Sequence, residues 1–404
     1  MPLESYDFVI VGGGVIGLTL SISLKKNFHN ASVLIIEKEN ILGFHASGRN
    51  SGVLHAGFYY TSDSLKAKFT RDGNAAMRQY CEKKSIKLNN CGKLVVCKDE
   101  QDLNRLTVLE ERAKSNNVEL YRISEKEAKN IEPKVVTLDS ALWSPTTSSV
   151  DPKQVMGSLL SDAVNLGVDV VVNTQYLYFD HDKDRVITNQ SSYGCKYFIN
   201  AAGLYADKIA LEWGFSQDYR VLPFKGLYLY PSSTIYRPKV HIYPIPDLKF
   251  PFLGVHLTLT VDGDVKIGPT AIPAFWRENY KGFDRFSLSE SFEIGIREIE
   301  LLAKNKFNFR SLALAEIRKY NKNNMIKDAS LLLSNAGELN FNKWGAPGIR
   351  AQLVNIKKGE LEMDFVCEGD NRSFHILNAV SPAFTCAIPF ANYLVDEIKK
   401  QLNY

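Results

Sequence analysis

The sequence predicts an α/β protein, α+β overall, in which a Rossmann-like dinucleotide-binding domain is interrupted by an inserted domain built on an antiparallel sheet. Two observations support this prediction. The chain opens on a short apolar run, Phe8 to Val11, followed at once by glycines in G-x-G-x-x-G register, which is typical of a buried parallel strand leading into a helix. Between Val221 and Pro269 apolar and aromatic runs alternate with Pro and Gly turns, as in antiparallel strands.

Each part of the opening motif has a physical role. Gly12 allows the tight turn, Gly14 lets the backbone approach a pyrophosphate, and Gly17 lets the helix pack close to the strand. The N-terminus of that helix offers N–H groups and a partial positive charge to the phosphates. A second apolar run, Val33 to Ile36, leads into Glu37, twenty residues after Gly17, where a carboxylate can accept hydrogen bonds from a ribose diol. The motif predicts a bound dinucleotide but does not distinguish FAD from NAD.

The remaining elements follow from hydrophobic spacing and from turn residues. Residues 41–60 are rich in Gly, Ser, Asn and His, so we expect an ordered loop that carries function. Pro152 begins a predicted helix and Gly167 ends it. Tyr197 to Asn200 predicts another buried strand, and small residues follow it, as a closely approaching cofactor requires. The other expected elements are helices over 64–84, 99–116, most of 283–320 and 387–402, strands over 93–97, 168–172 and 252–259, and a Gly/Pro loop over 344–350.

Composition limits the functional classes. The 404 residues are 45% hydrophobic, and 49 basic against 45 acidic side chains give a net charge of +4, too small to indicate nucleic acid. Six scattered cysteines form no C-x-x-C pair and no zinc spacing, so we expect reduced thiols and no metal. No apolar run reaches the ~20 residues that span a bilayer. The first strand begins close to Met1, which leaves no room for a signal peptide. We expect a cytoplasmic location, with peripheral membrane contact left open.

Motifs spread from the first strand to the last helix point to a known family. They are His45–Tyr60, Ser64–Ala67, Cys91–Leu94, Pro223–Gly226, Ile242–Asp247, Pro251–Thr258, Gly348–Gln352 and Ser381–Ala383. With the layout above, they resemble the D-amino-acid-oxidase-like family of FAD-dependent oxidoreductases, and most closely its members that oxidise L-2-hydroxyglutarate. The chain departs from the family pattern at Lys225, Thr270 and Val380, where the family usually has Arg, Asn and Pro.

The resemblance implies noncovalently bound FAD, because Cys386 would lie at the pyrimidine end of the flavin, away from the position of covalent attachment. It implies an FAD-binding domain over 1–90, 145–218 and 335–404 and a substrate-binding domain over 91–144 and 219–334. The start of the last helix would stabilise negative charge on the reduced flavin. The residues expected to bind FAD are Gly12, Gly13, Gly14, Val15, Ile16, Gly17, Glu37, Lys38, Ser47, Asn50, Ser51, Gly52, Ala201, Ala202, Gly203, Ser381, Pro382, Ala383 and Thr385.

The implied reaction is oxidation of a small 2-hydroxy dicarboxylic acid, L-2-hydroxyglutarate to 2-oxoglutarate, with hydride transfer to flavin N5. It needs a base for the hydroxyl proton, and histidine suits that role because its ordinary pKa lies near operating pH. His55 follows the loop that the resemblance places at the flavin. His256 lies on the predicted strand 252–259 and shares a face with Gly254 and Thr258. Both stay candidates, with a slight preference for His55, and a purely structural histidine is the alternative for each. His45 fits a residue of the cofactor loop better than a base.

Two cations are candidates for gripping the substrate carboxylates. Arg350 can bind a carboxylate in bidentate fashion, and Lys225 would act as a point charge. The alternative for Arg350 is an ordinary ion pair at a surface or a domain interface. Tyr243 and Tyr60 could donate hydrogen bonds, but packing is the default interpretation for a chain with 19 tyrosines.

Two other functions stay open. One is an FAD-dependent oxidase for an amine, an amino acid or glycerol phosphate, and the other is a catalytically inactive FAD-binding module. The sequence does not choose among oxygen, a quinone and a protein as electron acceptor.

Overall fold

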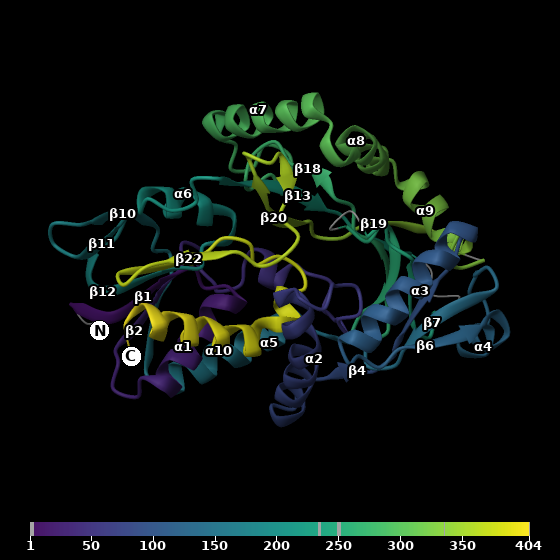
Figure 1. Cartoon of the computed structure of the whole chain (residues 1–404), viewed down its shortest axis with the longest axis horizontal. Coiled ribbons are helices and arrows are strands. Elements are labelled where there is room, and N and C mark those ends of the chain that lie inside the picture. Colours follow the sequence, from purple (N-terminus) through teal and green to yellow (C-terminus); the bar gives the residue numbers. More distant parts are fainter. Residues whose placement is uncertain (1–3, 233–235, 249–251, 335, 404) are drawn as a thin grey trace. The chain divides into compact units, whose positions relative to one another are not determined.

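The computed structural model describes residues 4–232, 236–248, 252–334 and 336–403, and the chain forms two compact units (Figure 1). The first unit comprises Met1–Arg49, Pro152–Val221 and Ala351–Tyr404, and the second comprises Asn50–Asp151 and Leu222–Arg350. Strands β13 (Tyr219–Gly226) and β20 (Gly348–Asn355) carry the chain across the division. Pro251, part of one family motif, lies outside the described residues.

The first unit is an α/β layer structure. Its elements are β1 (Ser5–Val11), α1 (Val15–Asn27), β2 (Val33–Ile36), α5 (Pro152–Asn165), β9 (Val168–Val171), β10 (Tyr176–Asp180), β11 (Arg185–Thr188), β12 (Ser192–Asn200), α6 (Ala206–Glu212), β21 (Glu360–Leu361), β22 (Cys367–Gly369), β23 (Ser373–Ile376) and α10 (Ala383–Gln401). The central sheet has the order β10-β11-β12-β1-β2-β9, with β23 also beside β12. Strand β1 pairs in parallel with β2 and β12, and helices α1 and α10 lie side by side (Figure 1).

The burial of this sheet explains the continuous apolar runs in the sequence. All four residues of β2 and the last four of β1 are buried, because helices cover a parallel sheet on its faces. Val9, Leu34 and Phe198 join neighbouring strands in one apolar cluster. The predicted strand–turn–helix–strand opening is therefore confirmed, as is the start of α5 at Pro152.

The second unit is built on a mixed sheet. Its elements are β3 (Val53–Leu54), α2 (Leu65–Lys83), β4 (Leu88–Asn89), β5 (Lys93–Val96), α3 (Glu100–Ser115), β6 (Tyr121–Ser124), α4 (Glu125–Ile131), β7 (Ser140–Ser144), β8 (Ser148–Val150), β14 (Leu229–Pro231), β15 (His241–Pro244), β16 (His256–Leu259), β17 (Val265–Gly268), β18 (Ile272–Pro273), α7 (Leu288–Lys304), α8 (Phe309–Ile317), α9 (Lys322–Ser330) and β19 (Phe341–Trp344). The large sheet has the order β19-β14-β17-β16-β15-β5-β7-β6. The expected antiparallel pairing holds for β14 to β17, but β5 and β15 run parallel.

The compact units do not follow the predicted domain boundaries everywhere. Residues 50–90, 145–151 and 335–350 belong to the second unit, although the sequence assigned them to the FAD-binding domain. A small sheet in which β8 pairs with both β3 and β4 holds the first two segments together, and the Ser149 hydroxyl of β8 donates to the Leu259 carbonyl of the large sheet. Which unit binds FAD and which binds substrate stays a prediction.

Three predicted elements are wrong at their ends. The strand expected over 252–259 begins only at His256, because Gly254 has a φ of +73° and turns the chain before it. Residues 348–350, expected in a loop, start β20, and the last helix begins at Ala383 instead of 387.

All six cysteines are free thiols. Within the described residues, no helix combines the length and the apolar character that crossing a bilayer requires.

Candidate active site

The glycines of the opening motif are required by close backbone contacts. Gly12 has a φ of +115°, and a Cβ there would lie 2.4 Å from the carbonyl oxygen of Ala201. A Cβ on Gly17 would lie 2.0 Å from the carbonyl oxygen of Gly12. Gly14 differs, because its Cβ would meet only the Ser47 hydroxyl, at 3.2 Å. The backbone is therefore accessible at Gly14, and this geometry fits a bound pyrophosphate at the start of α1.

The Glu37 carboxylate is buried beside this turn. It accepts the Gly13 N–H through Oε2 and the Glu39 N–H through Oε1, both at 2.9 Å. Burial raises the pKa of Glu37, although the two N–H donors oppose the shift. Each oxygen has two lone pairs, so the carboxylate can still accept from a ribose diol. The predicted role of Glu37 is compatible with these contacts.

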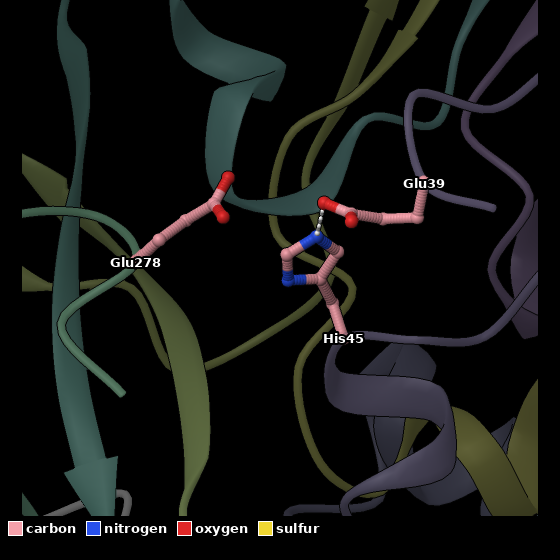
Figure 2. A group of neighbouring side chains, drawn as sticks. All are labelled: Glu39, His45 and Glu278. Carbon is pink, nitrogen blue, oxygen red and sulfur yellow. Dashed lines mark hydrogen bonds and ion pairs between the residues drawn. The ribbon is translucent and has the colours of Figure 1, made fainter. Parts of the chain in front are cut away.

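The loop after Glu37 is held by a second acid. Figure 2 shows the His45 imidazole facing the Glu39 carboxylate, with 3.0 Å between Nε2 and Oε1. Lys38 contacts the same oxygen at 2.7 Å. His45 therefore helps to fix the loop, which fits the expected cofactor-loop residue better than a base.

Two predicted N–H donors already have partners. The Val15 N–H donates to the Ser47 hydroxyl at 2.9 Å, so Ser47 caps α1 from the following loop. The Ala383 N–H donates to the Val380 carbonyl at 2.9 Å, and the role of Ala383 in FAD binding stays a prediction. The other predicted FAD residues lie in the first unit, except for Asn50, Ser51 and Gly52, which belong to the second unit.

The loop that carries His55 is anchored through its backbone. Asn74 of α2 donates its amide hydrogens to the carbonyls of Leu54 and His55, at 3.1 and 3.2 Å. Asn116, which follows α3, donates to the carbonyls of Gly57 and Tyr60. His55 is 8% exposed, and burial, with a smaller contribution from the positive charge of Lys93, lowers its pKa to about 3.

His256 has a tautomer fixed by its neighbour. Its Nδ1 lies 2.9 Å from the carbonyl oxygen of Gly254; because a carbonyl only accepts, Nδ1 carries the proton and Nε2 of the neutral ring has a lone pair. The ring stacks on Tyr243 with 3.7 Å between centroids. Burial lowers the pKa of His256 well below 6.5, and the charges of His55 and Lys93 lower it further. The structure thus brings both candidate bases together in the second unit.

His241, a third buried imidazole nearby, has a structural role. Its Nδ1 accepts the N–H of Leu259 at 3.0 Å, and its Nε2 lies 3.3 Å from the hydroxyl of Ser149. Both ring nitrogens are therefore occupied by the protein, which argues against a role as base.

The two candidate carboxylate anchors lie on β13 and β20, neighbouring strands of one sheet. Lys225 is buried, and its Nζ donates to the Oδ1 of Asn279, a neutral amide, at 2.9 Å. Thr270 donates its hydroxyl to the Lys225 carbonyl at 2.8 Å. Arg350 lies over the ring of Phe252, 5.3 Å from its centroid, and burial lowers its pKa to about 10. Because the Asn279 amide carries no charge, it leaves the positive charge of Lys225 unneutralised. A group that binds an anion needs such a charge.

Sequence reasoning missed Lys93. This residue begins β5, is 0% exposed, and has three aromatic rings within 5 Å of its Nζ. Its only sequence signal was membership of the motif Cys91–Leu94, which says nothing of burial. Asn74 and Asn116 were also missed, because no local pattern shows which carbonyls an asparagine side chain will reach.

Comparisons with known proteins agree with this arrangement. A family model described as FAD dependent oxidoreductase matches residues 7–312. Human mitochondrial L-2-hydroxyglutarate dehydrogenase is 35% identical over 430 aligned positions, which cover 98% of this chain and 89% of the human protein. Escherichia coli L-2-hydroxyglutarate dehydrogenase is also 35% identical, over 98% of this chain and 94% of the bacterial protein.

Solved structures show the same fold. Dithionite-reduced L-α-glycerophosphate oxidase from Mycoplasma pneumoniae, with FAD bound, has a TM-score of 0.74 at 22% identity and covers 100% of this chain and 96% of its own. Glycine oxidase from Geobacillus kaustophilus has a TM-score of 0.73 at 17% identity, covering 99% of this chain and 96% of its own.

Proposed function

This chain belongs to the family of FAD-dependent oxidoreductases, and from that premise we propose that it oxidises L-2-hydroxyglutarate to 2-oxoglutarate. The names of its relatives supply the substrate. The observation that carries the proposal is the neutral imidazole of His256, held by Gly254 with its Nε2 lone pair available. A 2-hydroxy acid has a hydroxyl proton that such a base can take.

The chemistry divides between cofactor and protein. FAD, when bound, supplies the two-electron acceptor for the hydride that leaves Cα. The hydroxyl proton passes to Nε2 of His256, and the C–O bond becomes the carbonyl of the 2-oxo acid. We prefer His256 to His55 because the Gly254 carbonyl fixes its tautomer, whereas the sequence alone gave a slight preference for His55.

Lys225 and Arg350 hold the substrate in this proposal. A dicarboxylate carries two negative charges, and these two cations can bind one carboxylate each. Asn279 orients the Lys225 ammonium without neutralising it. The planar guanidinium of Arg350 can bind a carboxylate through two parallel hydrogen bonds.

We expect FAD to be bound noncovalently. Cys386 is fully buried and lies within helix α10, and burial makes a thiol inert toward attachment. Acid precipitation of the yellow protein should therefore release all of the flavin into the supernatant. Flavin that stays with the pellet after denaturation and washing would show a covalent bond and contradict this expectation.

Anaerobic flavin reduction tests the proposed substrate directly. We expect L-2-hydroxyglutarate to bleach the flavin absorption band of the purified holoenzyme, and the D-enantiomer to leave it unchanged. Bleaching by glycine, by other amino acids or by glycerol phosphate, but not by the hydroxy diacid, would favour an oxidase for one of those substrates. A flavin that none of them reduces would favour an inactive binding module. Reoxidation by oxygen, a soluble quinone or an added protein would then identify the electron acceptor.

A further inference from the structure

Lys93 is a buried cation that the proposed reaction does not yet use. Its side chain is 0% exposed, and its Nζ has no hydrogen-bond partner in the part of the chain that the structure describes. The Nζ lies 4.6 Å from the ring centroids of Phe58 and Tyr59 and 4.9 Å from that of Tyr243. Three ring faces therefore take the place of the carboxylate or carbonyl that a buried ammonium normally has.

This arrangement costs stability. Burying an ammonium without a hydrogen-bonded partner is strongly unfavourable, and each cation–π contact returns only about 0.5–2 kcal/mol. The desolvation of the ammonium outweighs the attraction of the three rings, because burial lowers the pKa of Lys93 to about 7. An apolar side chain of similar length would fill the same space without that cost, so packing alone does not explain a lysine here.

The groups around Lys93 are bases and phenols. His241 and Tyr243 come from β15, His256 from β16, and His55 and Tyr59 from the anchored loop. The positive charge of Lys93 lowers the pKa of all three histidines. Four other titratable groups lie in these surroundings. Tyr60 raises the pKa of Tyr59, and Cys91 raises that of Tyr243. Tyr243 raises the pKa of Tyr228, and the charge of Lys266 lowers that of His241. Within the described residues, no Asp or Glu shifts the pKa of Lys93 or of these three histidines.

We propose that Lys93 is a positioning residue: its buried positive charge acts together with burial to keep the imidazoles of His55 and His256 deprotonated, so that a neutral base is present when substrate binds. The proposal rests on the proposed function, because it assigns the purpose of that charge to the base. Like charges disfavour each other in a buried site. A proton on Lys93 therefore disfavours a proton on either imidazole.

The variant Lys93→Met removes the charge and keeps an apolar chain against the three rings. In the holoenzyme without substrate, NMR signals of the His55 and His256 rings should titrate at a pKa at least about one unit higher than in wild type. In stopped-flow reduction by L-2-hydroxyglutarate, the limb in which the rate rises with pH should move to higher pH by the same amount. The plateau rate above that limb should stay within about twofold, and the thermal midpoint should not fall.

Two further variants separate charge from packing. Lys93→Arg keeps the positive charge, and should leave the histidine titrations and the rate limb at their wild-type positions. Lys266→Met makes the same substitution at another buried lysine of this unit, one whose charge lowers the pKa of His241 but is not a cause of the shifts at His55 and His256. The ring signals of His55 and His256 should therefore titrate as in wild type in that variant.

A folded, FAD-loaded Lys93→Met protein with unchanged histidine titrations would overturn the proposal. If Lys93→Met does not fold, Lys93→Gln takes its place; if neither neutral variant folds, Lys93 serves the fold itself and the proposal is wrong. Failure of the proposed function looks different. In that case the wild-type flavin is not reduced by the hydroxy diacid, while the histidine titrations of the Lys93 variants still decide the role of the lysine.

Discussion

Replacing His256 with Ala should slow flavin reduction by L-2-hydroxyglutarate by about 10²–10⁴-fold, the usual contribution of a positioned general base. The FAD content should stay unchanged, because the glycines of the opening motif belong to the first unit and His256 to the second. The pH dependence has a definite sign. Reduction should rise with pH as the imidazole loses its proton, and in wild type this limb should lie below pH 6.5, because burial lowers the pKa of His256. In His256→Ala the limb should be absent.

His55→Ala and His29→Ala are the comparisons for this experiment. His29 is exposed, so its replacement should change neither rate nor pH profile. If His55→Ala abolishes the acid limb and His256→Ala retains it, His55 is the base and our preference is wrong. If both variants reduce flavin at near wild-type rates with an unchanged profile, the proton goes to another group.

Replacing Arg350 with Ala should weaken the dicarboxylate far more than it weakens FAD. Removing one partner of a desolvated ion pair typically costs ~2–5 kcal/mol, which corresponds to roughly thirtyfold to several thousandfold in affinity. The apparent Kd from the substrate dependence of flavin reduction measures this loss. Lys225→Met should weaken binding in the same sense, because one substrate carboxylate would lose its ammonium partner.

Arg237→Ala provides a matched control. Arg237 belongs to the same unit, but its side chain is 54% exposed and lies 3.5 Å from Asp264, so its loss should leave the apparent Kd unchanged. A Kd that barely moves in both Arg350→Ala and Lys225→Met would place the carboxylates elsewhere. A monocarboxylate 2-hydroxy acid should lose affinity in only one of the two anchor variants.

The opening unit could be predicted because its signals are local. Gly12 and Gly17 have no space for a side chain, and the buried runs of β1 and β2 reflect a sheet covered on both faces. The contact of Gly17 with Gly12 is local, and the apolar runs can be read directly from the sequence, whereas the contact of Gly12 with the Ala201 carbonyl joins distant segments. The same logic gave the start of α5, where Pro152 fixes the first helical residue.

In the second unit, the features that depend on contacts between distant segments could not be predicted from the sequence. The expected strand over 252–259 overlooked the turn at Gly254, and with it the carbonyl that fixes the tautomer of His256. Lys93 has no local signal of burial, because its rings come from residues 58–59 and from Tyr243. The partner of Lys225 is likewise far along the chain, at Asn279. Spacing identified the types of residue needed but not their neighbours.

The anchoring of the His55 loop separates its path from its chemistry. Asn74 and Asn116 grip main-chain carbonyls, which every residue type possesses. The backbone of this loop is therefore held in place independently of the side chain of His55. A lineage that altered the side chain at position 55 could change the chemistry there while the two asparagines kept the backbone in place, whereas Gly57, with a φ of +109°, and the buried Phe58 and Tyr59 are constrained.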